Sequence, residues 1–131
     1  MTTRTSFLFT LTLALAGSTL MAQEAAVRSL LSKDLVEGPG KELTMITVDY
    51  PPGGSSPVHR HHAQALVYVL EGTIVMQAKG GAPVTLTAGQ TWYEGPDDVH
   101  VVSRNASAVE PARYLVCLVK AKGAPILVPV K

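Results

Sequence analysis

The sequence predicts an all-β fold, a single jelly-roll β-barrel of about eight strands. Short segments rich in β-branched and aromatic residues recur along its 131 residues, and stretches rich in glycine and proline separate them. A chain of this length is enough for one domain with one modest core. Neither an internal repeat nor a low-complexity tract breaks the pattern, so a repeat architecture is excluded.

Seven segments carry the pattern of a strand. In one of them, Ile74 and Met76 alternate with Val75 and Gln77, which is typical of a strand with one buried face. The expected strands are 43–50, 65–70, 73–79, 84–87, 90–94, 99–104 and 114–120.

The last of these strands has a distinct composition. The run YLVCLV, from Tyr114 to Val119, is apolar throughout and predicts a strand that is covered on both faces. Cys117 within it is expected to be a buried small hydrophobe, and as the only cysteine it has no partner for an intramolecular disulfide. The apolar segment 124–130 is expected to cover the barrel or a partner subunit, because small jelly rolls expose sheet edges. We therefore expect a homodimer.

The N-terminus has the features of a cleavable secretory signal helix. Arg4 precedes an apolar stretch, Phe7–Ala16, that is too short to span a bilayer comfortably. Small residues follow, and cleavage is expected after Ala22. The alternative is an uncleaved single-pass anchor. In a bacterial source, such a leader implies a periplasmic or secreted protein.

Cleavage divides the chain into a signal peptide at 1–22, an N-terminal arm at 23–42 and a β-barrel domain at 43–131. A short helical turn is expected around 23–32, and no stable membrane anchor remains. Loss of Arg4 leaves basic and acidic residues equal in number, so the mature chain is formally neutral. No basic aromatic strip points to nucleic acid, and a small molecule is the expected partner.

All four histidines lie in two short stretches of the sequence. His59, His61 and His62 fall in PGGSSPVHRHHAQ, and His100 falls in EGPDDVHVV. Histidine is the commonest metal ligand, and His59 and His61 on an extended strand would point to the same face. His62, their neighbour, should project to the opposite face. His100, returning from a later strand, would complete a three-histidine site for a divalent metal with positions open for water or substrate.

The spacing around these histidines resembles the motifs of the cupin superfamily. From Gly53 to Gly72 the chain follows the first motif, G-x5-H-x-H-x3-E-x6-G, except that Ala65 replaces the glutamate. The second motif, G-x5-P-x-G-x2-H-x3-N, can be laid on Gly89 to His100, although its proline and glycine are replaced and its asparagine arrives one residue late. The resemblance spans residues 53–105 and implies a small single-domain cupin jelly roll with His59, His61 and His100 as metal ligands.

Ala65 is the most consequential departure, because a methyl group cannot coordinate a metal. If the strand is regular, Ala65 faces inward with the histidines, and the neighbouring Gln64 points away unless the chain twists. Glu94, six residues before His100, is a candidate for a substitute ligand, a catalytic general base or a hydrogen-bond acceptor for a histidine. Its alternative role is an exposed or turn-capping carboxylate. Restoring the family carboxylate with Ala65→Glu is expected to tighten metal binding.

An open histidine site predicts a metal-dependent enzyme, most simply a dioxygenase acting on a small hydroxylated or aromatic molecule. The metal could be Fe, Mn, Ni, Cu or Zn, and imidazole is a favoured ligand of Fe, Ni, Cu and Zn. One alternative is a non-catalytic protein that binds a metal or small ligand, and another is a metal-dependent isomerase, lyase or decarboxylase. Trp92 and Tyr93 are candidates to line the pocket, whereas Tyr68 should face away.

Overall fold

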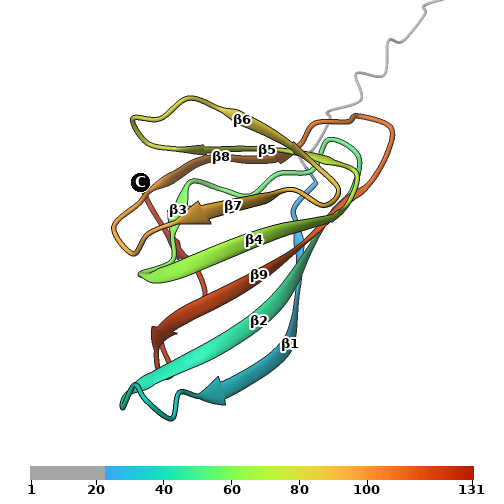
Figure 1. The fold of residues 1–131 in the computed structure, drawn as a ribbon. Helices are drawn as coiled ribbons and strands as arrows, with labels where there is room; N and C mark the ends of the chain where they lie inside the picture. Colours follow the sequence, from blue (N-terminus) through green and yellow to red (C-terminus); the bar gives the residue numbers. More distant parts are fainter. Residues whose placement is uncertain (1–22) are drawn as a thin grey trace, which may run out of the picture.

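The structure, a computed structural model, describes residues 23–131 as two antiparallel sheets that pack face to face (Figure 1). One sheet has the strand order β1-β2-β9-β4-β7 and the other β10-β3-β8-β5-β6. The strands are β1 (Ala26–Asp34), β2 (Lys41–Tyr50), β3 (His59–Arg60), β4 (Ala63–Glu71), β5 (Thr73–Ala78), β6 (Val84–Thr87), β7 (Thr91–Glu94), β8 (His100–Asn105), β9 (Ala112–Ala121) and β10 (Val128–Pro129). The expected signal helix lies outside the described residues.

The all-β jelly-roll prediction is confirmed, and each of the seven expected strands has a counterpart among β2 and β4 to β9. Most strands that follow one another in the chain lie in opposite sheets, as in a jelly roll; the exceptions are the pairs β1–β2 and β5–β6. β2 leads to β3 in the other sheet, β4 returns, and β9 closes the first sheet between β2 and β4. Within residues 23–131, no helix is long and apolar enough to span a membrane.

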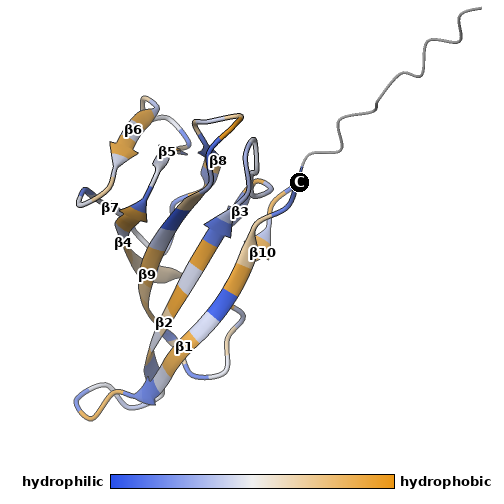
Figure 2. Ribbon diagram, turned by 90° about the vertical axis from the view of Figure 1, so that its right-hand side faces the viewer, coloured by the Kyte–Doolittle hydropathy of each residue, from blue (hydrophilic) through white to orange (hydrophobic). Residues whose placement is uncertain are grey.

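The helical turn expected around residues 23–32 is wrong, because β1 occupies this segment. The sequence AVRSLLSKD has little alternation of its own, and its strand conformation comes from a ladder with β2 that extends from the Ala26–Asp49 pair to the Asp34–Glu42 pair. An irregularity between Ser29 and Leu31 shifts the register. β1 is an edge strand with every residue exposed, and along it apolar and polar residues mix without a regular period (Figure 2).

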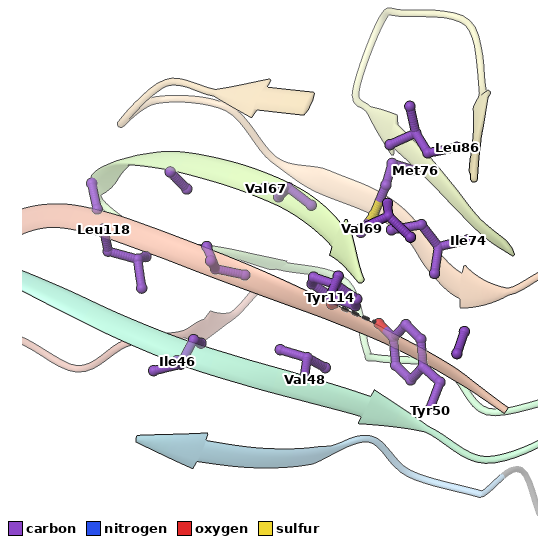
Figure 3. Packing of buried hydrophobic residues seen from close by; sticks show 14 residues of the cluster. Ile46, Val48, Tyr50, Val67, Val69, Ile74, Met76, Leu86, Tyr114 and Leu118 are labelled. Carbon is purple, nitrogen blue, oxygen red and sulfur yellow. Dashed lines mark hydrogen bonds between the residues drawn. The ribbon is translucent and has the colours of Figure 1, made fainter. Parts of the chain in front are cut away.

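The core lies between the inner faces of the two sheets, where alternate residues of each strand point (Figure 3). Ala63, Ala65, Val67 and Val69 of β4 are buried, and the residues between them are exposed. β2 and β9 alternate in the same way. The largest fully buried side chains are those of Tyr50, Ile46, Ile74, Met76, Leu118 and Val69.

The outer face of β9 departs from the prediction that this strand is covered on both faces. Tyr114, Val116 and Leu118 are buried, whereas Leu115 and Cys117 are partly exposed. β2 and β4 flank β9 in its sheet, but no element of residues 23–131 is layered on the outer face. Cys117 is therefore not the buried hydrophobe that the apolar run suggested.

The C-terminal segment covers the open edge of the second sheet. β10 pairs with β3, and Ile126 packs against the core. The Lys120 ammonium, buried at the inner face of β9, bonds the Glu42 carboxylate and donates to the carbonyl of Ala124 at 2.6 Å. The expectation that this apolar tail covers the barrel is confirmed.

Candidate metal centre

The structure brings three of the four histidines together inside the barrel. His59 on β3 pairs with His100 on β8, so strand register places their side chains beside each other. His61 follows β3, and its Nε2 lies 3.2 Å from Nε2 of His59. All three imidazoles are at least 90% buried. Their convergence, which the spacing predicted, is present, although no strand runs continuously through it.

The chain crosses between the two sheets at His62. This residue has a φ of 48°, the one positive value outside glycine within residues 23–131, and its side chain is exposed. The left-handed bend ends β3 after two residues and starts β4 in the opposite sheet. A regular strand, the condition under which His59, His61 and Ala65 would share one face, is therefore absent between His59 and Ala65, yet both His61 and Ala65 face inward.

A carboxylate joins the histidines from the neighbouring strand. Glu94 ends β7, is only 2% exposed, and pairs in register with Ala65 of β4. Its Oε1 lies 2.9 Å from Nε2 of His61, and its Oε2 lies 3.4 Å from Nδ1 of His100. Ala65 occupies the position where the motif has glutamate. Glu94, directly opposite Ala65 on the neighbouring strand, supplies the carboxylate instead. Gln64 is exposed on the outer face and takes no part.

The four side chains form one group. One ligand atom from each of His59, His61, Glu94 and His100 lies within 4.8 Å of the others. This compact arrangement of three imidazoles and one carboxylate could hold a divalent metal ion.

Backbone carbonyls fix the orientation of two of the imidazoles. Nδ1 of His59 donates to the carbonyl of Pro57 at 2.7 Å, and Nδ1 of His61 donates to the carbonyl of Ile126. Because a carbonyl only accepts, each Nδ1 carries a proton and the lone pair of a neutral ring lies on Nε2. Both Nε2 atoms point into the group. Such outer hydrogen bonds orient the ring of a metal-ligating histidine and raise its basicity.

Burial and the Glu94 carboxylate set the protonation of the group. Burial lowers the pKa of His59 and lowers the pKa of His100 to about 4, so both rings are neutral at physiological pH. Burial also acts to lower the pKa of His61, but the hydrogen bonds to Glu94 and to Ile126 outweigh it, and the pKa is raised. A metal bound here would displace a proton shared by His61 and Glu94.

Three buried polar atoms of this group have no hydrogen-bond partner: both ring nitrogens of His100 and Oε2 of Glu94. Buried polar atoms without partners are rare and costly. All three are metal-ligand types, and all belong to the same group. A neutral imidazole has a lone pair on only one ring nitrogen, so a bound metal would satisfy that nitrogen of His100 and Oε2 of Glu94. The residues present therefore fit a divalent transition metal.

The group forms part of the wall of a cavity of about 330 Å³. Trp92 packs against His100 with ring centroids 4.7 Å apart, while Tyr93, expected at the pocket, is 55% exposed on the outer face. Tyr68 faces outward as expected. The cavity is lined by Val27, Ile46, Val48, Ser56, His59, His61, Val67, Met76, Glu94, His100, Tyr114, Val116, Ile126 and Leu127. Its walls are mainly apolar away from the metal-ligand group.

This chain is similar to one family profile and to several solved structures. The profile described as "Cupin domain" matches residues 46–118. A cupin domain from Bordetella pertussis Tohama I is 18% identical to this chain, with a TM-score of 0.62, covering 79% of this chain and all of that one. An oxalate oxidase in complex with the substrate analogue glycolate is 26% identical, with a TM-score of 0.64, covering 93% of this chain and 63% of that one. No curated protein sequence is significantly similar to this chain.

A further structure with the same fold is a DMSP lyase from Ruegeria pomeroyi DSS-3. It is 23% identical to this chain, with a TM-score of 0.66, covering 90% of this chain and 59% of that one. The chain therefore spans less than two thirds of the length of either the lyase or the oxidase. At these identities, the likeness to the lyase and to the B. pertussis domain shows the fold alone.

Proposed function

Because the chain belongs to the cupin family, we propose that its buried group of three histidines and Glu94 holds a divalent transition metal. We propose that the metal serves an enzyme, most simply a dioxygenase of small hydroxylated or aromatic molecules. The observation that carries the proposal is the position of the group on the wall of a cavity with otherwise mainly apolar sides. Pockets of this kind, with few polar groups at one place, are typical of small-molecule sites.

The bound metal would supply Lewis acidity and, if it is redox-active, the means to activate dioxygen. The residues of the chain would hold the metal and orient a substrate beside it. The three imidazoles and the carboxylate face the cavity from three segments, residues 59–61, β7 and β8, and Trp92 packs against the ring of His100. The apolar walls keep water from the site, which strengthens polar interactions within it.

Redox chemistry is favoured over base-catalysed chemistry by the other residues of the cavity. Among the described residues that line it, Tyr114 is the only titratable side chain outside the metal-ligand group. Burial raises the pKa of Tyr114 well above its usual value, so this phenol is not a general base. A catalytic base role for Glu94 requires that the carboxylate leave the metal. An isomerase, lyase or decarboxylase that needs a separate base therefore has less support.

The decisive experiment is the metal content of protein isolated without added metal, followed by activity. We expect about one transition metal per chain, the occupancy of a single closed ligand group, measured by elemental mass spectrometry. With Fe, Mn, Ni or Cu, dioxygen consumption in the presence of catechols and small hydroxy acids is then expected. Dioxygen consumption that never depends on substrate would refute the dioxygenase. Substrate turnover without dioxygen would favour the lyase or isomerase, and a metal without any turnover would favour a binding protein.

Matched histidine variants locate the metal. His100→Ala is expected to abolish stoichiometric binding, because it removes a buried ligand whose two ring nitrogens have no other partner. His62→Ala should retain the metal, because that side chain is exposed at the bend between the sheets. Equal metal loss in both variants would contradict the assignment.

We also propose export of the chain and assembly into a homodimer. The sequence of the first 22 residues supports export. An apolar outer patch supports the dimer: Leu66, Tyr68 and Tyr93 are exposed there, beside the partly exposed Leu115 and Cys117. The patch carries no charged side chain, so two copies can meet about a two-fold axis without like-charge repulsion.

Native mass spectrometry tests both proposals on one sample. We expect twice the mass of a chain that begins at Gln23, and a monomer of unchanged metal content for Leu66→Glu, because a charge would then be buried at the interface. A full-length chain would refute cleavage. A monomeric wild type, or a Leu66→Glu variant that remains dimeric, would refute this interface.

A further inference from the structure

A second polar feature of the cavity lies away from the metal-ligand group. Four hydroxyl groups meet there around Tyr50, which is only 1% exposed. The Tyr50 hydroxyl lies 2.7 Å from Oγ of Ser56 and 2.6 Å from Oγ of Ser103, and it accepts from the Tyr114 hydroxyl at 3.2 Å. Figure 3 shows the two tyrosines joined by this bond, beside Met76 and Val69 of the core. We call these four side chains the hydroxyl cluster.

The hydroxyl cluster faces the same cavity as the metal-ligand group. Tyr114 and Ser56 line the cavity directly, and Val48, Val67 and Val116 are among the apolar residues that line the rest. Leu118 of β9 pairs with Ala65, the register partner of Glu94. Tyr114 lies four residues before Leu118 on the same inner face, a separation of about 13 Å along the strand. Because both places line one cavity, a single ligand could contact both.

The cluster also has unused hydrogen-bonding capacity. Tyr114 donates to Tyr50, and its only other polar contact within residues 23–131 is Oγ of Ser103 at 3.5 Å, so its oxygen can accept from a ligand. Ser56 contacts only Tyr50 through its side chain, and its hydroxyl can donate or accept. No charged side chain belongs to the cluster, and each of its members is a neutral hydroxyl. The chemical complement of such a group is a neutral hydroxyl, which both donates and accepts.

We propose that the hydroxyl cluster is a second recognition point, which binds the distal hydroxyl of a substrate whose other end coordinates the metal. This inference rests on the proposed function, because the first end of the substrate must meet a metal. It adds the class of substrate: a small molecule with two adjacent oxygen ligands at one end, an apolar body and a hydroxyl at the far end.

The size of the cavity agrees with a body of about one ring. A cavity of about 150 Å³ lined by apolar side chains can bind benzene. The present cavity, of about 330 Å³, has room for a ring with substituents at both ends. The valine side chains and Met76, which line the cavity, would contact that ring.

Two pairs of hydroxamic acids test the inference on zinc-loaded protein. Benzohydroxamic acid and 3-phenylpropanohydroxamic acid carry a metal-chelating end and an apolar body of two lengths. Each is compared with its para-hydroxylated form, and dissociation constants are measured by isothermal titration calorimetry. We expect the hydroxylated form of at least one pair to bind about five- to tenfold more tightly, the effect of one net hydrogen bond. Tyr114→Phe should erase this preference and leave the affinity of the parent compound unchanged.

Tyr68→Phe is the matched control, because that tyrosine loses the same hydroxyl on the outer face. It should keep the full preference. Ser56→Ala provides a second variant if Tyr114→Phe fails to fold, and it should reduce the preference. Equal affinities within both wild-type pairs, or a preference that survives Tyr114→Phe and Ser56→Ala, would overturn the inference. A different outcome would refute the proposed function and the inference with it. This outcome is that the parent compounds bind the metal-free protein as tightly as the zinc-loaded protein, or bind neither.

Discussion

Glu94→Ala is expected to weaken binding of a divalent transition metal by at least about 100-fold, because loss of even an outer hydrogen-bond partner of a metal ligand costs 10- to 100-fold. Glu94 is itself one of the proposed metal ligands rather than an outer partner of one. Its carboxylate contacts His61 at 2.9 Å and lies 3.4 Å from His100. It also supplies the only negative charge of the metal-ligand group, which would otherwise be three neutral imidazoles. Competition with a metal-binding dye of known affinity measures the effect.

A second substitution can return the carboxylate from the other strand. Ala65 and Glu94 are direct register partners, and the Cβ atoms of such partners lie about 5 Å apart. The double variant Glu94→Ala with Ala65→Glu is therefore expected to regain most of the lost affinity. Ala65→Glu alone should weaken metal binding, because it buries a second carboxylate beside Glu94. The sequence alone suggested tighter binding.

Gln64→Ala is the control for both changes, since the Gln64 side chain is exposed on the outer face and should not affect metal affinity. Failure of the double variant to recover affinity while it remains folded would mean that residue 65 does not reach the metal. Full metal affinity in Glu94→Ala would remove Glu94 from the ligand group.

Leu118→Ala is expected to lower the free energy of unfolding by about 2–5 kcal/mol, the usual cost of a buried leucine-to-alanine change. Leu118 is fully buried and lies on the inner face of β9, between Thr44 of β2 and Ala65 of β4. A cavity there has small neighbours that cannot readily fill it. Thermal denaturation of the metal-free protein should show a fall in Tm of roughly 10–25 °C.

Leu30→Ala is the matched control on the exposed edge strand β1, where Leu30 is 48% exposed. It should change the free energy of unfolding by no more than about 0.5 kcal/mol. Equal losses of stability in the two variants would contradict the described core. Denaturation must be compared without metal, because a bound ion stabilises the folded state by mass action.

The strands were predictable where the sequence carries its own signal. β4 alternates buried and exposed residues, and the composition of β9 is apolar enough to be recognised without a partner. β1 has no such signal, because its strand conformation depends on pairing with β2. β3 and β10 have two residues each, too few for any periodicity, and they exist as strands only through pairing, β3 with β10 and β8, and β10 with β3.

The metal-ligand group was predictable only in part for the same reason. The spacing of His59, His61 and His100 is a local property of the sequence, and it identified the residues that meet. Which residue replaces the missing glutamate depends on the register between β4 and β7, which no local pattern records. The carbonyl of Ile126, a backbone group 65 residues from His61, has no sequence signal at all.

The hydrogen bond from His61 to Ile126 also bears on the order of events during folding. Contacts between residues far apart in sequence form slowly, because closing a long loop costs entropy before the contact repays it. The pairing of His59 with His100 needs the chain only as far as β8, but the ring of His61 is oriented by a segment beyond β9. The metal-binding geometry is therefore complete only once the segment that holds Ile126, next to β10, has docked beside β3. A metal ion would be captured by a nearly finished barrel rather than act as a nucleus around which the nascent chain folds.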